Sequence, residues 1–294
     1  MAAKGIDAWL AYELRRAGFD GNTIWPRAES PRVLPASVTQ LLTSLEKKNK
    51  TAAAEAQAVR SRLAAGGLSG GVGSADAYIM GKNYFKQVDV IMTDWDSGPE
   101  ILISTKRMSA SFGNNAYNRV EESYGDAKNL RGRHPLAAHG YIFALSTAIF
   151  EEGRLALAHK LMDLLEKLGN EEDAYDSVCL LLVEGLTTTH PNIQPLVGVD
   201  VYDRLTDENQ ELLDSDIGLL LQNLPVISSV DQVRIPANPA HKNPREVVFD
   251  VSYELLPNKF MKDTVEQVLS ASPIERHSEA RKRRGWPLVV EMPK

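Results

Sequence analysis

The chain has 294 residues, of which 43% are hydrophobic and 24% are charged, so it is long enough for a large core and has an ordinary globular composition. No apolar run approaches the ~20 residues that a membrane-spanning helix needs, and we expect no signal peptide. The single cysteine, Cys179, excludes an internal disulfide framework and a cysteine-based zinc site, so a reducing cytoplasm is the expected setting.

Charge is distributed unevenly along the chain. The net charge is −6, which by itself argues weakly against a nucleic-acid binder. Residues 163–221 hold fourteen acidic and two basic side chains, whereas residues 1–75 hold ten basic and six acidic ones, and residues 106–133 hold six basic and three acidic ones. Because the acid is concentrated in one block, the other two regions remain locally positive, as binding to a polyanion requires.

Residues 1–75 are predicted to form a helical N-terminal region. Their periodicity and alanine content predict helices over residues 5–18, 37–49 and 51–65. The glycine-rich connector over residues 64–74 lacks the Gly-Lys-Ser/Thr ending of a phosphate-binding loop, so we interpret it as a linker or a mobile loop. The last two helices carry basic residues that either contact phosphates or form a solvated helix face: Lys47, Lys48, Lys50, Arg60 and Arg62.

The chain next reads as an antiparallel hairpin. An apolar run over residues 88–92 is followed by turn residues and then by a β-rich run over residues 100–106. Residues i and i+2 share one face of a strand, so Ser104 and Lys106 point the same way, and Asp89 faces them if the register allows it. Charges beside buried strands are costly unless they are paired or bind a metal. The pattern therefore predicts a cluster of a carboxylate, a hydroxyl and an ammonium group.

These residues resemble the PD-(D/E)xK nuclease superfamily, which includes many restriction endonucleases. Its members carry an Asp on one strand, and then an acidic residue, any residue and Lys on the next strand. Asp89 and Lys106 match this pattern at a typical spacing, but Ser104 stands where the second acid belongs, and Gln87-Val88 stands where Pro is frequent. A subgroup of restriction enzymes has Ser-x-Lys and takes the missing glutamate from the following helix, roughly four helical turns after the Lys. The resemblance covers about 35 residues, and its motif is short.

Two glutamates, Glu121 and Glu122, fall in that window of the helix predicted over residues 114–130. At 100 degrees per residue, Glu121 lies on the flank of the apolar stripe of this helix and Glu122 lies nearly opposite the stripe. We therefore expect Glu121 to reach back toward the strands and Glu122 to face solvent. The residues that form the predicted stripe are Tyr117, Val120, Tyr124 and Ala127.

The resemblance implies a Mg²⁺-dependent endonuclease of the type II restriction kind, which hydrolyses phosphodiester bonds in double-stranded DNA. Asp89 and Glu121 would hold the metal, Lys106 would orient the water or neutralise developing charge, and Ser104 would give a supporting hydrogen bond. Cutting both strands implies a homodimer or a higher assembly. Polar and basic residues near the motif are the candidates for DNA contact: Arg107, Asn114, Asn118, Arg131 and Arg133.

The rest of the chain is predicted to complete an α/β fold, in which helices flank a central mixed sheet. A restriction-endonuclease-like core is expected over residues 76–205, and a C-terminal extension over residues 206–294 is expected to pack on it. The extension carries a basic tail, which is either a phosphate clamp or a solvated segment and consists of Arg276, His277, Arg281, Lys282, Arg283 and Arg284. Helices are predicted over residues 135–150, 154–168, 211–223 and 263–270, and strands over residues 178–183, 197–202 and 246–255.

Two other functions stay open. Ser104 in place of an acid also fits a catalytically inactive protein of the same fold that binds DNA or assembles a defence or repair system. The placement of Glu121 relative to Asp89 discriminates this protein from the nuclease. A protein-interaction module that carries the motif by chance would bind no DNA even at low salt.

Overall fold

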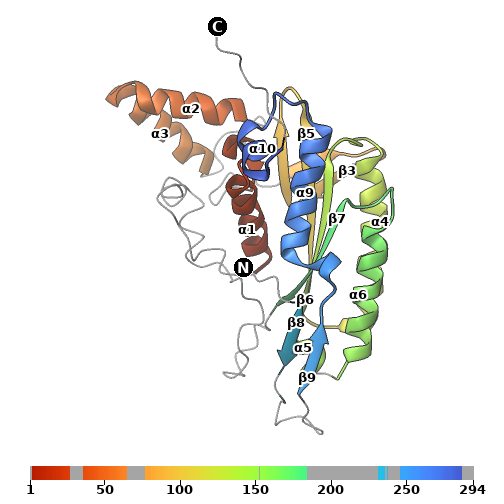
Figure 1. Cartoon of the computed structure of the whole chain (residues 1–294). Helices are drawn as coiled ribbons and strands as arrows, with labels where there is room; N and C mark the ends of the chain where they lie inside the picture. Colours follow the sequence, from red (N-terminus) through yellow and green to blue (C-terminus); the bar gives the residue numbers. More distant parts are fainter. Residues whose placement is uncertain are drawn as a thin grey trace.

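Five strands form a mixed sheet at the centre of the protein, and helices cover both of its faces (Figure 1). The computed structural model describes residues 2–26, 36–64, 77–151, 153–183, 231–235, 237 and 246–286. The predicted fold class, a mixed α/β fold with a central sheet and flanking helices, is confirmed. Among the helices in the described ranges, none combines the length and the apolar character that crossing a membrane requires.

The strands are β1 (Ile24–Trp25), β2 (Ala77–Met80), β3 (Phe85–Val88), β4 (Val90–Asp94), β5 (Gly98–Met108), β6 (Ala138–Ser146), β7 (Ser177–Val183), β8 (Gln232–Ile235) and β9 (Val247–Asp250). The helices are α1 (Ala2–Arg16), α2 (Ala36–Lys48), α3 (Lys50–Ala64), α4 (Phe112–Arg131), α5 (Ala148–Glu151), α6 (Leu155–Gly169), α9 (Pro257–Ala271) and α10 (Ser278–Arg284). Within the described ranges the chain also forms two short 3-10 helices, η1 (Gly21–Thr23) and η3 (Tyr253–Leu255).

The central sheet has the strand order β1-β4-β5-β6-β7. β4 and β5 pair antiparallel, which confirms the predicted hairpin, and Val90 lies opposite Ile103. β5, β6 and β7 run parallel, so α4 and α6 return the chain from the end of one strand to the start of the next. The sheet therefore has a parallel half that is buried on both faces and an antiparallel edge that the hairpin supplies.

One face of the sheet is covered by helices from distant parts of the chain. α1 contributes Trp9 and Leu10, and α9 contributes Phe260 and Leu269, to one buried cluster with alternate residues of β4 to β7. The two helices lie over this face in Figure 1. Burying each large apolar side chain stabilises the fold by about 1.5–3 kcal/mol, so both helices are integral to the sheet body.

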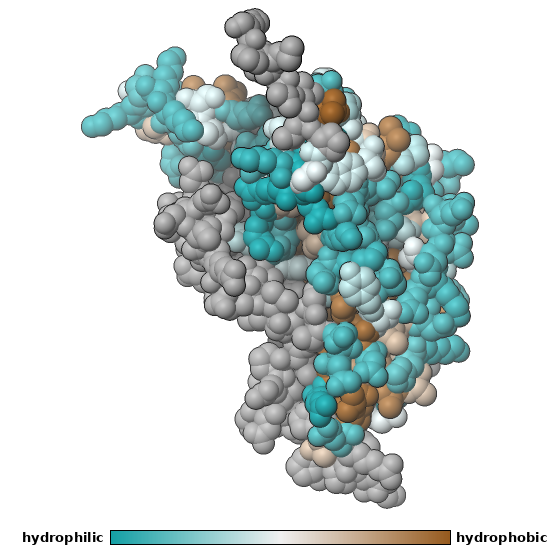
Figure 2. Space-filling view, viewed as in Figure 1, coloured by the Kyte–Doolittle hydropathy of each residue, from teal (hydrophilic) through white to brown (hydrophobic). Residues whose placement is uncertain are grey.

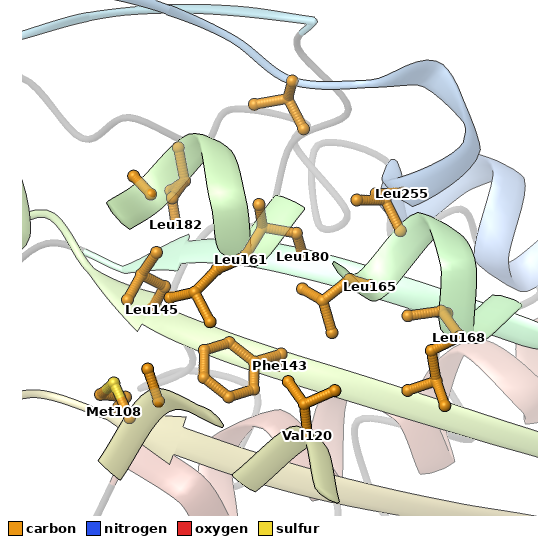
Figure 3. Close-up of a cluster of buried hydrophobic side chains, with 14 of the residues drawn as sticks. Met108, Val120, Phe143, Leu145, Leu161, Leu165, Leu168, Leu180, Leu182 and Leu255 are labelled. Carbon is orange, nitrogen blue, oxygen red and sulfur yellow. The ribbon is translucent and has the colours of Figure 1, made fainter. Parts of the chain in front are cut away.

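The other face is covered by α4 and α6. Leucines of α6 at helical spacing, among them Leu161 and Leu165, pack on Phe143 of β6 and Leu180 of β7, and Val120 of α4 lies beside them (Figure 3). The expected helix over residues 154–168 is thus confirmed as α6, and the expected strand over residues 178–183 is confirmed as β7. The small hairpin of β2 and β3 packs near the end of α4 on this same side.

The predicted N-terminal helices are all present, but they have different places in the fold. α1 packs on the sheet, and β1 pairs with β4. α2 and α3 instead form an antiparallel helical hairpin that stands away from the sheet (Figure 1). We call this hairpin, residues 36–64, the arm.

The C-terminal part of the fold ends in a short helix that contacts α1. The guanidinium group of Arg281 on α10 donates to the carbonyls of Leu269, Ser272 and Pro273 at 2.8–3.1 Å, and so caps the end of α9. Gly18, which has φ +99°, lies so close to Ala280 that a Cβ atom there would stand 2.8 Å from the Ala280 nitrogen. This close approach requires a glycine at the end of α1.

One predicted element is wrong. Residues 135–150 were expected to be a helix, but residues 138–146 form β6, whose nine residues are all buried. A central parallel strand is apolar on both faces and so lacks the polar alternation that marks most strands. Side-chain size still differs between the two faces of β6: the small Gly140 and Ala144 lie with Ile142 on the face of α1 and α9, whereas the large Tyr141 and Phe143 lie on the face of α4 and α6.

The C-terminal predictions are partly confirmed. The expected helix over residues 263–270 is the longer α9, and the expected strand over residues 246–255 is the short β9 followed by η3. The expected strand over residues 197–202 and helix over residues 211–223 lie outside the described residues, as does nearly all of the glycine-rich connector.

Candidate functional site

Asp89 lies directly before the first residue of β4. Its backbone N–H donates to the carbonyl of Ile103 at 3.2 Å, and its carboxylate accepts the backbone N–H of Thr105 at 2.8 Å. The register of β4 with β5 begins at Val90, which pairs with Ile103, and Asp89 is the bend directly before it. The hairpin therefore brings the predicted carboxylate to the backbone of β5 between Ser104 and Lys106.

Ser104 and Lys106 point to the face of the sheet that α4 covers. In the register of β5 with β6 they lie beside Tyr141 and Phe143, which belong to the apolar cluster under α4 and α6. Ser104 is 3% exposed, whereas Lys106 and Asp89 are half-buried. The hydroxyl is therefore enclosed by the protein, while the carboxylate and the ammonium group lie where solvent and a ligand reach them.

Thr105 connects this strand to α1 through the opposite face of the sheet. Its hydroxyl donates to the carboxylate of Asp7 at 2.8 Å, while its backbone N–H donates to Asp89. Asp7 is buried at the sheet surface of α1. Thr105 therefore holds both the carboxylate of Asp89 and, through Asp7, the helix α1.

The buried stripe of α4 differs from the predicted one. The two tyrosines of the predicted stripe, Tyr117 and Tyr124, are only partly buried, and Tyr117 lies under the ammonium group of Lys160 on α6 at 4.8 Å. On a helical wheel the stripe is rotated by roughly 70° from the predicted one. The fully buried residues that form it are Phe112, Ala116, Val120, Ser123, Ala127 and Leu130.

This rotation moves the two glutamates. Glu121 is exposed and lies roughly 150° from the centre of the buried stripe, so the expectation that it reaches back to the strands is not met. Glu122 is also exposed, but it lies on the side of the helix nearer Tyr141. Its carboxylate forms an ion pair with the guanidinium group of Arg119 at 2.9 Å. Of the two, Glu122 is the better placed to act with the strand residues.

Two buried tyrosines hold α4 against the sheet. The rings of Tyr141 and Tyr175 lie 5.1 Å apart between their centroids. The hydroxyl of Tyr141 donates to the carbonyl of Arg119 at 3.4 Å, and that of Tyr175 donates to the carbonyl of Ser123 at 3.1 Å. Both bonds are made to the turn of α4 that carries Glu122, so they fix that turn over β5 and β6.

Carboxylates surround the tyrosine pair. Burial raises the pKa of both phenols, and the negative charge of Asp126 raises both further. Asp89 adds to this effect at Tyr175, and Glu122 adds to it at Tyr141. The phenols therefore stay protonated as hydrogen-bond donors, and the three carboxylates lie within electrostatic reach of the same pair of rings.

The candidate DNA-contacting residues are divided between two places. Asn118 and Arg133 are exposed, and Arg107 is half-buried with its Nε atom unpartnered among the described residues. Nothing is described of the side chain of Asn114. Arg131 pairs with Asp176 at 2.7 Å, at the end of α4 that lies away from Lys106. Arg131 thus ties α4 to β7.

Comparison of the chain with models of protein families, with curated proteins and with solved structures finds no match. Function must therefore be argued from the site itself.

The candidate metal ligands of this region are oxygen donors. In the part of the chain that the structure describes, no group of three or more histidine, cysteine or acidic side chains is placed to hold a metal ion. Mg²⁺ is commonly held by one or two protein carboxylates, with waters and substrate phosphates as its other ligands. Asp89 and Glu122 are carboxylates that fit this role, because hard oxygen donors favour Mg²⁺ over softer metals.

Several residues of this site were not anticipated from the sequence. Asp126, which forms an ion pair with Lys86 of β3, reads in the sequence as an ordinary helix residue. Tyr141 lies in the segment that was predicted as a helix, and Asp7 lies far from the motif. The only available signal was the alternation of small and large residues in β6, which would have set Tyr141 on the face of α4.

Proposed function

We propose that this protein is a Mg²⁺-dependent endonuclease that hydrolyses phosphodiester bonds in double-stranded DNA. One observation carries the proposal: the carboxylate of Asp89, directly before β4, accepts the backbone N–H of Thr105, the residue between Ser104 and Lys106 on the neighbouring strand. An acid on one strand and Ser-x-Lys on its neighbour is the arrangement that the resemblance to PD-(D/E)xK nucleases requires.

The residues have distinct roles in this proposal. Lys106, half-buried at the end of β5, orients the attacking water or neutralises charge on the phosphorus oxygens as the water adds and the leaving oxygen departs. Ser104 would give a supporting hydrogen bond from an enclosed position. Thr105 fixes the carboxylate of Asp89 through its backbone N–H.

Asp89 and Glu122 would hold the metal. When bound, Mg²⁺ would polarise the phosphoryl oxygen and lower the pKa of a bound water. The assignment of Glu122 replaces that of Glu121, because Glu121 is exposed on the far side of α4 from the buried stripe.

The test is Lys106→Ala. We expect cleavage to fall by roughly 10²-fold or more, because an ammonium group aimed at developing charge is lost. The variant and the wild type are incubated with mixed genomic and phage DNA with and without Mg²⁺, and the rate of fragment formation is compared. Lys82→Ala, at an exposed lysine between β2 and β3, is the matched control and is expected to cut at the wild-type rate.

Folding and DNA binding of the Lys106→Ala variant are measured separately. We expect the thermal unfolding curve and a band shift without Mg²⁺ to match those of the wild type, because Lys106 lies at the rim of the core. Unchanged cleavage in this variant would exclude Lys106 from the reaction and remove the basis of the proposal.

A second candidate is a catalytically inactive protein of the same architecture that binds DNA or assembles a defence or repair system. It is favoured by Ser104 in place of an acid and by the exposed position of Glu121. A salt-sensitive band shift without fragments, together with no Mg²⁺ binding by calorimetry, would support this candidate. A homodimeric or higher assembly and a cytoplasmic setting are further parts of the proposal, the first because two strands must be cut and the second because the single cysteine is buried and unpaired.

A further inference from the structure

The arm is a self-contained element. Leu42 of α2 and Ala56 and Leu63 of α3 form a small core of their own. Glu46 on α2 and Arg60 on α3 join the two helices by an ion pair of 2.6 Å. α2 reaches the body of the protein beside η1. The arm therefore holds its surface side chains in a fixed arrangement while it stands out from the sheet.

The charge of the arm is opposite to that of the whole chain. Its 29 residues, 36–64, hold five basic and two acidic side chains, a net charge of +3, whereas the chain carries −6. The Glu46–Arg60 pair leaves one acid, Glu55, against the remaining basic residues. These four are exposed and make no ion pair with another described residue: Lys47, Lys48, Lys50 and Arg62.

The basic residues lie along one helix and at one tip. Lys47, Lys48 and Lys50 lie together where α2 turns into α3, and Arg62 lies about 18 Å further along α3. Each strand of DNA carries one phosphate per about 3.4 Å of the duplex axis, so a helix of this length can lie beside several of them. Figure 2 shows the visible side of the arm as mostly hydrophilic.

The solvent face of α3 is otherwise short and uncharged. Beyond Lys50, the side of α3 opposite the buried residues of the arm consists of Ala54, Gln57, Ala58 and Ser61, while the exposed acid Glu55 lies on a flank of the helix. Short side chains let a polyanion approach the helix closely, and the flanking cations then act at short range. A helix face that served only for solvation would more often carry long side chains of both signs.

We propose that the arm binds the phosphate backbone of double-stranded DNA through Lys47, Lys48, Lys50 and Arg62, independently of base sequence. This inference rests on the proposed function, since it takes DNA as the substrate. The basic tail has another role, because Arg281 caps α9 and Arg284 pairs with Glu266. Of the two roles that the sequence left open for the tail, the phosphate clamp is therefore assigned to the arm instead.

The test measures DNA binding without cleavage. A fluorescent duplex of random sequence is titrated with protein in EDTA, and anisotropy gives the affinity at several KCl concentrations. In the variant K47Q/K48Q/K50Q/R62Q we expect the affinity at 0.1 M salt to fall roughly 100-fold or more, and the slope of log affinity against log salt to shrink by about 3–4.

A matched control removes the same number of positive charges from positions outside the arm. The variant K128Q/K167Q/R234Q/K282Q removes four exposed charges outside the arm and is expected to keep the wild-type salt slope within about one unit. Circular dichroism of both variants checks that the helices persist, which is expected because all eight side chains are exposed.

Equal slopes for the arm variant and the wild type, or no binding by the wild type at low salt, would overturn the proposal. Weaker binding with an unchanged slope, together with a shift from dimer to monomer in sedimentation, would assign the arm to subunit contact instead. Binding through the arm is measured in EDTA, so it can hold even if Lys106→Ala shows that the proposed cleavage site is inactive.

Discussion

His139 is a buried histidine whose charge state affects the stability of the fold. It is 1% exposed, its Nε2 atom lies 2.9 Å from the carbonyl of His134, and its Nδ1 atom has no partner among the described residues. Burial lowers the pKa of His139 from 6.5 to about 4, and the positive charge of Arg131 contributes. A second proton would place an unpaired charged N–H in the core.

This lowered pKa predicts a loss of stability in acid. Between pH 6.5 and 4 the unfolded chain binds a proton at His139 that the folded protein does not, so stability falls as pH falls through this window. The contribution is fully present above pH 6.5, and its loss is on the order of 3 kcal/mol by pH 4. Urea unfolding at a series of pH values measures it.

A variant isolates the contribution of His139. His139→Gln keeps a donor for the carbonyl of His134 but does not titrate. The slope of its unfolding free energy against pH should therefore be smaller than that of the wild type, by the equivalent of about one bound proton. His159→Gln, at an exposed position on α6, should leave the slope in place. An identical slope in His139→Gln would assign the pH dependence to other groups.

At the scale of the element, α4 decides which carboxylate joins the strand residues. Its buried stripe sets Glu122 on the side of Tyr141 and Glu121 away from it. Glu122→Gln is therefore expected to lower Mg²⁺-dependent cleavage by roughly 10²-fold, since a metal carboxylate is lost, and Glu121→Gln to stay within about threefold of the wild type. Single-turnover cleavage rates compare the two, and the reverse order would mean that α4 turns when DNA binds.

The same helix shows how far the sequence predicts the site. The hairpin with Asp89, Ser104 and Lys106 follows from strand alternation and turn residues, which are local signals. The orientation of α4 does not, because Ala116 and Ser123 are buried although they carry little hydrophobic signal.

β6 could not be predicted for a related reason. Alanine, leucine and an initial proline favour a helix locally, but two layers of helices bury both faces of this strand. The decisive contacts come from α1, α4, α6 and α9, which are distant in sequence. Tertiary packing therefore overrides local propensity at β6, and Tyr141 was missed with it.

At the scale of the whole molecule, Arg281 joins the C-terminal helices to the rest of the fold. It is 3% exposed, and its guanidinium group satisfies carbonyls at the end of α9. Arg281→Met keeps the length of the side chain but leaves these buried acceptors unsatisfied. We expect it to lower the free energy of unfolding by roughly 2–4 kcal/mol, measured by urea denaturation.

A nearby arginine gives the control for this prediction. Arg283→Met removes an exposed side chain that pairs with Glu279, so it is expected to cost less than about 1 kcal/mol. Equal losses in the two variants would show that the cap on α9 adds no stability.

The pairing of α1 with α9 on one face of the sheet also bears on how the protein is made. α1 is synthesised before α9, and 240 residues of the chain lie between the two helices. Until α9 arrives, the apolar strand faces beneath it remain open to water and to other nascent chains. Translation that stops before residue 257 would release a polypeptide with this sheet surface uncovered, a form that chaperones bind and proteases remove.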